Sequence, residues 1–302
     1  KKRAGCIISS STQNKNSKKI IRVKNPISFL NRFAKLKREY SPAKIIAVTG
    51  SAGKTSLKNL IADLLQNFDT THSSPKSFNN YLGVPISLSN LSLEDKFGVF
   101  EVGMSKSGEI RNLSKLIKPH IGVITNIGEA HIENFKNING IAKAKSEIIE
   151  SIKEGGTLIL NRDDKFFELL LKKAKLYKLN VLSFGKHKKS DVQLKKIINN
   201  KNNSNIYVKI DDKLKKFKIG DLNIYNVLAS LAVLKKLNLD FSKVSKRFQY
   251  FQSSEGRGKK YIISRYKKRF NFIDESYNAN PLSVKYAINK LNLIKKRKSK
   301  KY

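Results

Sequence analysis

The sequence predicts an α/β protein whose central domain holds a mostly parallel sheet covered by helices. The first observation is the alternation of short apolar runs with amphipathic stretches between residues 44 and 184, which is typical of strands joined by crossover helices. The second is a glycine-rich turn that follows the first apolar run and opens a helical pattern. The third is size, because 302 residues with 39% hydrophobic content can build about two domains with buried cores.

The expected elements follow one another in order along this stretch. Short, mainly apolar runs predict strands, and these are Lys44–Val48, Phe97–Val102, Ile121–Asn126, Thr157–Leu160 and Val181–Phe184. Apolar residues at helical spacing predict helices between the strands, and these are Thr55–Asn67, Gly108–Ile117, Ile138–Ile152 and Asp164–Lys175. A parallel sheet with helices on both faces is therefore expected.

We interpret the first 41 residues as the end of an N-terminal domain. They contain one amphipathic helix pattern, formed by Ile27, Leu30, Phe33 and Leu36, and too little other apolar content to form a core of their own. We expect the central domain to occupy residues 42–256. Because position 1 is Lys and the only methionine is Met104, we also expect the chain to be a fragment or a processed piece.

The pattern weakens after the parallel unit. The polar run Asn199–Asn205 predicts a loop between two short strands, and the apolar positions of Asn223–Leu237 predict a helix. Beyond a linker-like Ser253–Gly258 come two short strand patterns and, from Leu282, a helical one. We interpret residues 257–302 as the start of a Rossmann-like C-terminal domain.

The net charge of +39 raises the possibility of a nucleic-acid partner, because basic domains bind phosphate backbones. However, the chain has 51 Lys against 11 Arg, is rich in Asn and Ile, and spreads its Lys over the whole length. These residues have AT-rich codons, so a compositional bias explains the charge as well as a partner does. We expect no specific nucleic acid, and a phosphate-bearing substrate remains open.

The cysteine content and hydropathy limit the class of protein further. The single cysteine, Cys6, cannot form an internal disulfide, which favours a reducing, cytoplasmic setting. No apolar run approaches the roughly 18 residues of a membrane span. A disulfide scaffold and a membrane-spanning protein are therefore not expected.

The sharpest motif lies in Thr49–Ser56, directly after the first strand. Glycines let backbone N–H groups close around phosphate oxygens, a lysine neutralises terminal phosphates, and the next hydroxyl can bind Mg²⁺. The motif predicts a phosphate-binding loop, although Val48 stands where the general pattern has its first glycine. The residues expected to hold phosphate are Gly50, Ser51, Ala52, Gly53, Lys54, Thr55 and Ser56.

Two further side chains follow the ends of expected strands. Glu101 lies at the end of the second strand, and His131 a few residues beyond the third. Ligands of α/β sheets bind at the carboxyl ends of the strands, so both side chains suit a divalent cation there. A lone histidine is also commonly structural or solvated, and that alternative stays open.

Lys145 conflicts with its own helix pattern. It falls on the apolar stripe of Ile138, Ala142 and Ile149, whereas Lys143 points elsewhere. Such a lysine either extends outward to water or has a depressed pKa, and a neutral amine can react with CO₂ to form a carbamate. The sequence leaves both outcomes open.

Together these motifs resemble the Mur ligases of peptidoglycan synthesis. The resemblance rests on the phosphate-binding loop, Glu101, His131, the Ala144-Lys145 helix and Asn223–Asn226, in the family's order. Three further segments are similar to the MurF type, and these are Phe78–Pro85, Glu101–Met104 with Gly108–Ile110, and Asp274–Pro281. The resemblance covers nearly all of residues 20–292.

The resemblance implies ATP-driven amide-bond formation, in which D-alanyl-D-alanine attacks an acyl phosphate of UDP-MurNAc-tripeptide. Lys54 and the loop amides would hold the β and γ phosphates. Thr55 and Glu101 would bind one Mg²⁺, and His131 with a carbamylated Lys145 a second. We expect ATP and Mg²⁺ as cofactors, these two substrates as partners, and a monomer.

The resemblance also implies contacts outside the phosphate loop. Asn226 would contact the adenine, Arg257 the ATP phosphates and Asp274 the ribose. Asn79 and Asn80 would be contacts on the substrate side. Taken alone, the first three also fit a helix surface residue, a linker charge and a strand-end cap. The chain departs from the family pattern at Leu222, where His is common, and at Glu255, where Pro is common.

Three alternatives remain. One is another member of the superfamily, either a MurE-type ligase or a folylpolyglutamate synthase, which the Phe78–Pro85 and Glu101–Met104 segments argue against. Another is a nucleic-acid-binding P-loop ATPase, which predicts salt-sensitive polyanion binding. The last is a truncated product without activity. Against it stand four intact residues, and these are Lys54, Glu101, His131 and Lys145.

Overall fold

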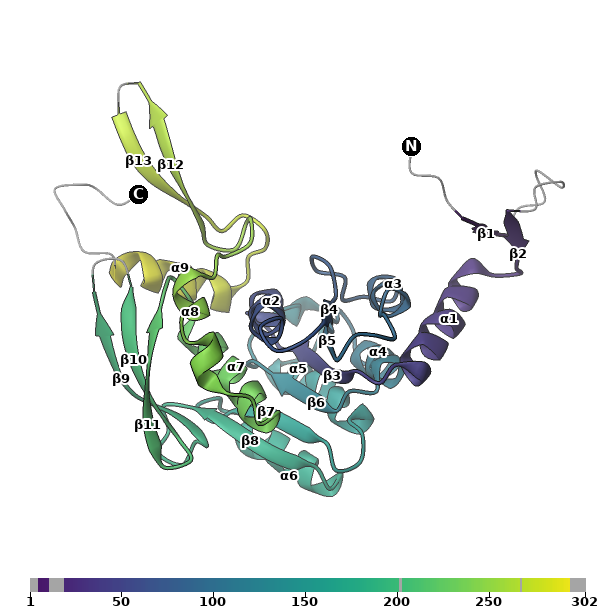
Figure 1. Cartoon of the computed structure of the whole chain (residues 1–302), viewed down its shortest axis with the longest axis horizontal. Helices are drawn as coiled ribbons and strands as arrows, with labels where there is room; N and C mark the ends of the chain where they lie inside the picture. The colour runs from purple at the N-terminus through teal and green to yellow at the C-terminus, as the bar shows by residue number, and fades with distance from the viewer. Residues whose placement is uncertain (1–4, 11–18, 201–202, 267, 294–302) are drawn as a thin grey trace.

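The computed structural model describes residues 5–10, 19–200, 203–266 and 268–293. Its centre is a nine-stranded sheet in the order β11-β10-β9-β8-β7-β6-β3-β5-β4 (Figure 1). Seven of its strands pair in parallel, and these are β3 (Lys44–Thr49), β4 (Thr71–Ser73), β5 (Phe97–Glu101), β6 (Ile121–Ile124), β7 (Thr157–Asn161), β8 (Asn180–Gly185) and, through its first two residues, β9 (Val192–Asn199). The predicted α/β fold with a mostly parallel sheet is confirmed.

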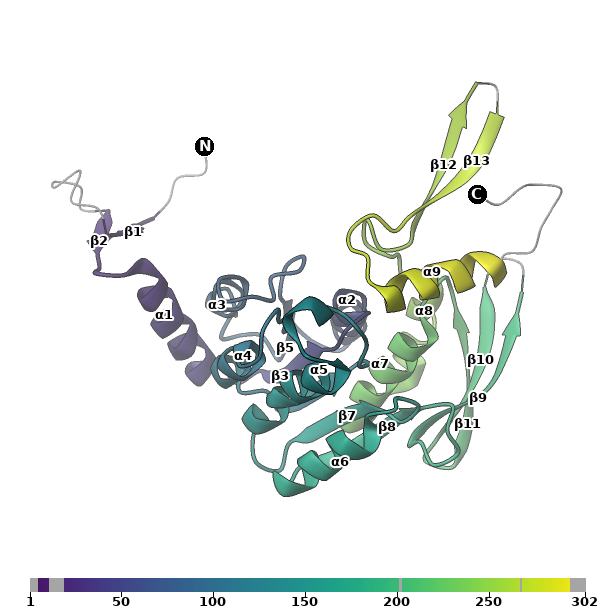
Figure 2. The same cartoon turned by 180° about the vertical axis from the view of Figure 1, so that it is seen from behind.

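Helices cover both faces of the parallel part. On one face lie α2 (Lys54–Leu65) and α7 (Ile224–Lys236), which are in front in Figure 1. The opposite face, seen from behind in Figure 2, carries α4 (Glu109–Ile117), α5 (Ile138–Lys145) and α6 (Phe167–Leu176). Successive β3 residues alternate between the two cores, so Ile46 and Val48 pack with α2 while Ile45 and Ala47 face the other way. This two-sided burial explains the continuous apolar run of β3.

Several elements differ from the sequence prediction. The predicted helix Ile138–Ile152 is α-helical only as far as Lys145 and continues as the 3₁₀ helix η2 (Ser146–Ser151). Where two short strands were expected there are three longer ones, and these are β9 (Val192–Asn199), β10 (Ser204–Ile210) and β11 (Lys213–Ile219). Residues 201–202 of the predicted loop lie outside the described residues. Strand β4 and helix α3 (Gly83–Ser89) were not predicted.

The N-terminal helix lies where predicted, but its apolar stripe does not form its buried face. In α1 (Pro26–Tyr40), Ile27, Phe33 and Leu36 are 42–50% exposed. The buried residues are instead Ala34 and Arg38. The Arg38 side chain donates to the carbonyls of residues 117 and 118 at the end of α4, at 2.6 and 2.7 Å. Before α1, β1 (Ile7–Ser9) and β2 (Ile20–Arg22) pair in parallel.

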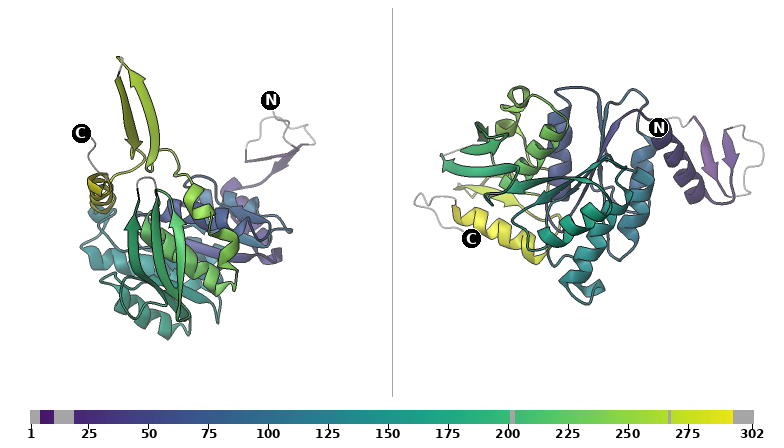
Figure 3. Two further views of the ribbon diagram at one scale, coloured as in Figure 1. Left: turned by 60° about the vertical axis from the view of Figure 1, so that its left-hand side comes forward. Right: turned by 90° about the horizontal axis from the view of Figure 1, so that it is seen from below.

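The C-terminal part begins after η3 (Phe241–Val244) and α8 (Arg247–Tyr250). Strands β12 (Lys259–Arg265) and β13 (Lys268–Asp274) form an antiparallel pair that projects from the body of the molecule, and α9 (Pro281–Leu293) follows (Figure 3). Both strands are longer than predicted. Within the described part of the chain, no helix is long and apolar enough to cross a membrane.

Candidate nucleotide and metal site

The loop between β3 and α2 is shaped by its two glycines. Gly50 has φ +146° and Gly53 has φ +81°, conformations that other residues rarely adopt. A Cβ on Gly50 would overlap the Oγ1 of Thr125, and one on Gly53 would lie 3.0 Å from the Oδ1 of Asn226. The glycines therefore let neighbouring loops approach this backbone closely. Lys54 begins α2, so the loop ends at a helix N-terminus suited to phosphate.

A second loop, which follows β6, braces the first. The Oδ1 of Asn126 accepts from Ala52 N at 2.9 Å, and the Oγ1 of Thr125 donates to the Ala52 carbonyl at 2.7 Å. The Ser51 hydroxyl and Gly128 backbone are also hydrogen-bonded at 2.8 Å. This bracing was not predicted, and the signal for it was the position of Thr125 and Asn126 at the carboxyl end of a strand adjacent to β3.

The structure brings together the predicted hydroxyl and carboxylate. Thr55 Oγ1 donates to Glu101 Oε2 at 2.6 Å, and Glu101 is 1% exposed. Asn79 Nδ2 donates to the other carboxylate oxygen at 2.7 Å. Ser77 joins this group, because its Oγ lies 3.2 Å from Thr55 Oγ1 and accepts from Arg257 Nη2 at 3.0 Å. Ser77 was missed in the sequence, where no pattern marks a lone hydroxyl on a loop.

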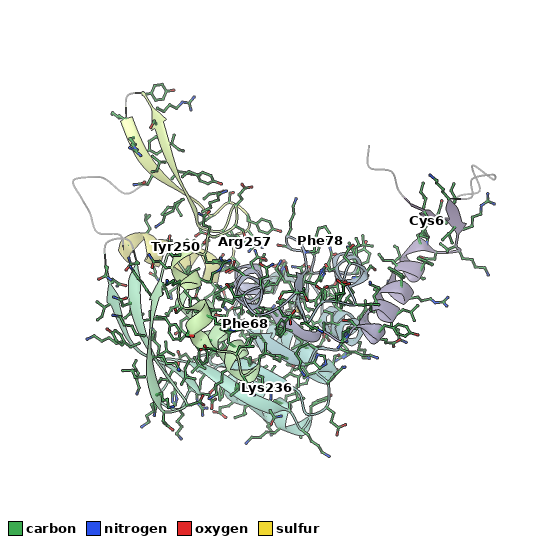
Figure 4. All side chains as sticks on the ribbon, in the orientation of Figure 1. Cys6, Phe68, Phe78, Lys236, Tyr250 and Arg257 are labelled. Carbon is green, nitrogen blue, oxygen red and sulfur yellow. The ribbon has the colours of Figure 1, made fainter. Side chains whose placement is uncertain are left out.

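Cationic side chains outnumber the carboxylate in this region. Lys54 Nζ donates to the Gly50 carbonyl at 3.1 Å. Burial lowers the pKa of Lys54, Glu101 opposes that shift, and Arg257 lowers the pKa further. Arg257 lies near the base of the hairpin formed by β12 and β13 (Figure 4). Its guanidinium carbon lies 3.9 Å from the centre of the Tyr277 ring. The excess of positive charge suits a polyanionic ligand.

Lys145 does not extend outward to water. It is 2% exposed, and its pKa is lowered well below the usual value, first by burial and then by Lys54. Of the two outcomes that the sequence left open, the structure favours the depressed pKa. A buried amine of this kind is neutral over a wider pH range and therefore nucleophilic.

The positions of three other predicted site residues do not by themselves indicate a role in the site. His131 lies on an exposed turn with φ +62°, its Nδ1 3.8 Å from Glu133 Oε1, and among the described residues no interaction joins it to Glu101. Asn80 Oδ1 accepts from Leu82 N at 3.2 Å, just before α3, and from Gly83 N at 2.9 Å, the first residue of α3. Asp274 accepts from Gly256 N at 2.9 Å, and hydrogen bonds, chiefly from Ser276, lower its pKa. Their functional roles remain predictions.

A phosphate-type loop at the end of a parallel strand, with a hydroxyl and a carboxylate beside it, defines a nucleotide-binding α/β protein of the P-loop class. The family model described as the Mur ligase middle domain matches residues 48–234. The chain belongs to the Mur ligase family, as the resemblance in its motifs indicated.

Relatives and solved structures agree with this assignment. The UDP-N-acetylmuramoyl-tripeptide–D-alanyl-D-alanine ligase of Rickettsia prowazekii is 33% identical over 95% of this chain and 64% of its own length. MurF from Acinetobacter baumannii superimposes with a TM-score of 0.83 at 30% identity, over 92% of this chain and 60% of that one. MurF from Thermotoga maritima in complex with ADP has a TM-score of 0.80 at 29% identity, over 96% and 66%. The chain thus spans about three-fifths of the relatives it matches.

Proposed function

We propose that this chain is part of an ATP-dependent ligase that joins D-alanyl-D-alanine to UDP-MurNAc-tripeptide through an acyl phosphate. The observation that carries the proposal is the hydrogen bond of Thr55 to Glu101 beside the Gly50–Gly53 loop. The proposal also rests on relatives that are named UDP-N-acetylmuramoyl-tripeptide–D-alanyl-D-alanine ligase. We assign residues 1–41 to an N-terminal domain, 42–256 to the central domain and 257–302 to a C-terminal domain. A monomeric, cytoplasmic enzyme completes the proposal.

The residues of the site suit the phosphates of ATP. Backbone N–H groups of the loop and the N-terminus of α2 would hold phosphate oxygens, and Lys54 would neutralise their charge. Arg257 would reach the same phosphates from the C-terminal segment, since it already contacts Ser77. Bringing a nucleotide and a carboxylate substrate together places two anions side by side, so convergent cations lower the barrier to phosphoryl transfer.

The residues present also fit divalent cations. Mg²⁺ would offset the repulsion between phosphate and carboxylate oxygens. Thr55 and Glu101 supply the hard oxygen ligands that Mg²⁺ prefers. Among the described residues no three His, Cys, Asp or Glu side chains form a ready-made cluster, so nucleotide and water would complete the coordination. For a second cation we propose His131 and a carbamylated Lys145, whose amine is buried and has a lowered pKa.

The remaining contacts follow the family pattern. We propose that Asn226, which touches the Gly53 carbonyl at 3.4 Å, contacts the adenine, and that Asp274 binds the ribose. Asn79 and Asn80 would contact substrate from the loop before α3.

Calorimetry with Mg²⁺ and ADP tests the nucleotide part of the proposal on the chain itself. We expect binding that Mg²⁺ strengthens and that disappears in Lys54→Ala, whereas the exposed control Lys115→Ala keeps the wild-type affinity. Phosphate release from ATP then tests the reaction. Release that needs both UDP-MurNAc-tripeptide and D-alanyl-D-alanine supports the ligase, and release stimulated by glutamate, by a diamino acid or by DNA would support one of the alternatives instead.

A further inference from the structure

Lys58 is a buried lysine that the mechanism above does not use. It follows Lys54 by one turn of α2, is 1% exposed and ranks among the largest fully buried side chains. Burying an ammonium group is costly unless its donors are satisfied. Burial lowers the pKa of Lys58 to about 8, while Glu101 raises it and Arg257 lowers it. A residue this costly to bury needs a structural or functional reason.

The partners of Lys58 are two backbone carbonyls of one loop. Its Nζ donates to the carbonyl of Ser74 and, at 2.8 Å, to that of Lys76. Lys76 has φ +45°, a conformation that is strained for a residue with a side chain. The strain persists only where the surroundings impose it, and the ammonium of Lys58 supplies such a constraint.

The same loop, residues 74–82, carries three side chains that touch the candidate site. Ser74 Oγ accepts from Glu101 N at 3.1 Å, and Asn79 Nδ2 donates to the Glu101 carboxylate at 2.7 Å. Ser77 Oγ contacts Thr55 at 3.2 Å and Arg257 at 3.0 Å. The path of this loop therefore decides where these groups meet Thr55 and Glu101.

We propose that Lys58 is a positioning residue that acts through the loop of residues 74–82 to hold Ser77 and Asn79 against Thr55 and Glu101, and so sets the affinity of the site for the metal–nucleotide complex. The proposal rests on the nucleotide site proposed above. In this proposal two successive turns of α2 have different roles. Lys54 contacts the loop between β3 and α2, whereas Lys58 holds the loop of residues 74–82.

The variant Lys58→Met tests the proposal, since methionine keeps most of the side-chain length and removes every donor. We expect amide hydrogen exchange to rise in residues 74–82 and to stay unchanged in the strands β3 and β6. We also expect the Kd for ADP with Mg²⁺ to rise about tenfold, the loss typical of one charged hydrogen-bonding group. The matched control is Lys115→Met on α4, which removes an exposed lysine and should change neither quantity. All measurements are made below the melting temperature of each variant.

A double-mutant cycle with Ser77→Ala separates positioning from general stabilisation. If Lys58 acts through the loop, the combined loss of affinity in Lys58→Met/Ser77→Ala is smaller than the product of the single losses. Multiplicative losses, or an unchanged exchange rate of residues 74–82 in Lys58→Met, would overturn the proposal. A purely structural lysine would lower the melting temperature without either effect.

The test also covers two other results, a Lys58→Met variant that does not fold and a wild-type chain that does not bind ADP with Mg²⁺. If Lys58→Met does not fold, Lys58→Gln takes its place, because its uncharged amide nitrogen ends one bond short of the Lys58 Nζ position and should not reach both carbonyls in their present place. Wild-type exchange and wild-type affinity in Lys58→Gln would then reject the proposal. If the wild-type chain does not bind ADP with Mg²⁺, the proposed function fails, whereas the exchange of residues 74–82 still decides whether Lys58 holds the loop.

Discussion

The hydroxyl of Thr55 lies 2.6 Å from the carboxylate of Glu101, which joins the first turn of α2 to the end of β5. Strand β3 explains why these two residues meet. It lies between β5 and β6, with Val48 opposite Glu101, and the strand order reverses around it. Such reversals open a crevice at the carboxyl edge of a parallel sheet, where ligands bind. The site therefore lies where the topology of the sheet leaves room for a ligand.

Glu101→Gln tests this contact. The amide is nearly isosteric and still accepts from Thr55, but it has lost the negative charge that a divalent cation requires. We expect the Mg²⁺-dependent part of ADP affinity to fall about 10- to 100-fold, and binding in the absence of metal to change little. Calorimetry with and without Mg²⁺ measures both. The exposed Glu94→Gln is the control, and an undiminished Mg²⁺ effect in Glu101→Gln would show that Glu101 is not a ligand.

Gly50→Ala tests the close approach of the two loops. The new Cβ would overlap Thr125 Oγ1 at a backbone φ of +146°, so the loop must shift away from its brace. We expect loss of detectable ADP binding and a lower melting temperature, because bulk and backbone strain both oppose the native loop. Gly5→Ala is the control, since open space surrounds that position. A Gly50→Ala protein that binds like the wild type would mean that the loop has another low-energy path.

The parts of this site that the sequence predicted are those that local patterns encode. Lys54, Thr55 and Glu101 stand at fixed offsets from the ends of apolar strands, and parallel pairing brings strand ends together. Ser77 and Lys58 escaped prediction because their partners are fixed by tertiary structure alone. The partners of Lys58 are backbone carbonyls 16 and 18 residues away, which no side-chain pattern records.

In the fold as well, elements that local sequence patterns encode were predicted, whereas features that depend on tertiary contacts were not. Short apolar runs predicted the strands β3 and β5 to β8, because β3, β5, β6 and β7 are buried on both faces for most of their length and β8 over its last three residues. The apolar stripe on α1 gave a wrong prediction of its buried face. The buried residues of α1 are Ala34 and Arg38, and Arg38 is held by hydrogen bonds to the end of α4 instead of by apolar burial. Helix Ile138–Ile152 changes to 3₁₀ geometry where Glu147 accepts from Gly108 N and Arg111 N, a tertiary contact that sequence periodicity does not reveal.

The lowered pKa of His120 leads us to expect that the stability of the fold depends on pH. Its Nδ1 accepts from Ile45 N at 2.8 Å, so the ring must be neutral, and burial together with Lys153, Arg38 and Lys44 lowers its pKa to about 4. Between pH 6.5 and 4 the unfolded chain binds the proton more readily than the folded one. Stability from this group is therefore complete above pH 6.5 and is lost as the pH falls toward 4.

The size of this effect is about 1–2 kcal/mol after allowance for solvent screening of a half-buried group. Denaturant titrations at pH 7, 6, 5 and 4 measure it. We expect His120→Asn, whose amide oxygen can accept from Ile45 N without titrating, to flatten the decline over that range. An equal decline in the variant and the wild type would assign the acid sensitivity to other groups.

Replacement of Lys145, which we propose as a metal ligand, is expected to raise the stability of the fold. Its amine is buried beside Lys54, and both burial and that charge lower its pKa. Because the unfolded chain keeps the proton more readily, this lysine costs stability at neutral pH, and the cost shrinks as the pH rises toward 10.5. In CO₂-free buffer we expect Lys145→Met to be more stable than the wild type by about 1–3 kcal/mol at pH 7, a rise of a few degrees in the melting temperature. The difference should narrow by pH 10.

The exposed neighbour Lys143→Met is the matched control and should show no such gain. Bicarbonate adds a second readout, because CO₂ can react with the neutral amine of Lys145 and give an anion that pairs with Lys54. We therefore expect bicarbonate to raise the melting temperature of the wild type and of Lys143→Met, but not that of Lys145→Met. A lower melting temperature for Lys145→Met in CO₂-free buffer would contradict the assignment of Lys145 as a residue kept for function at a cost in stability.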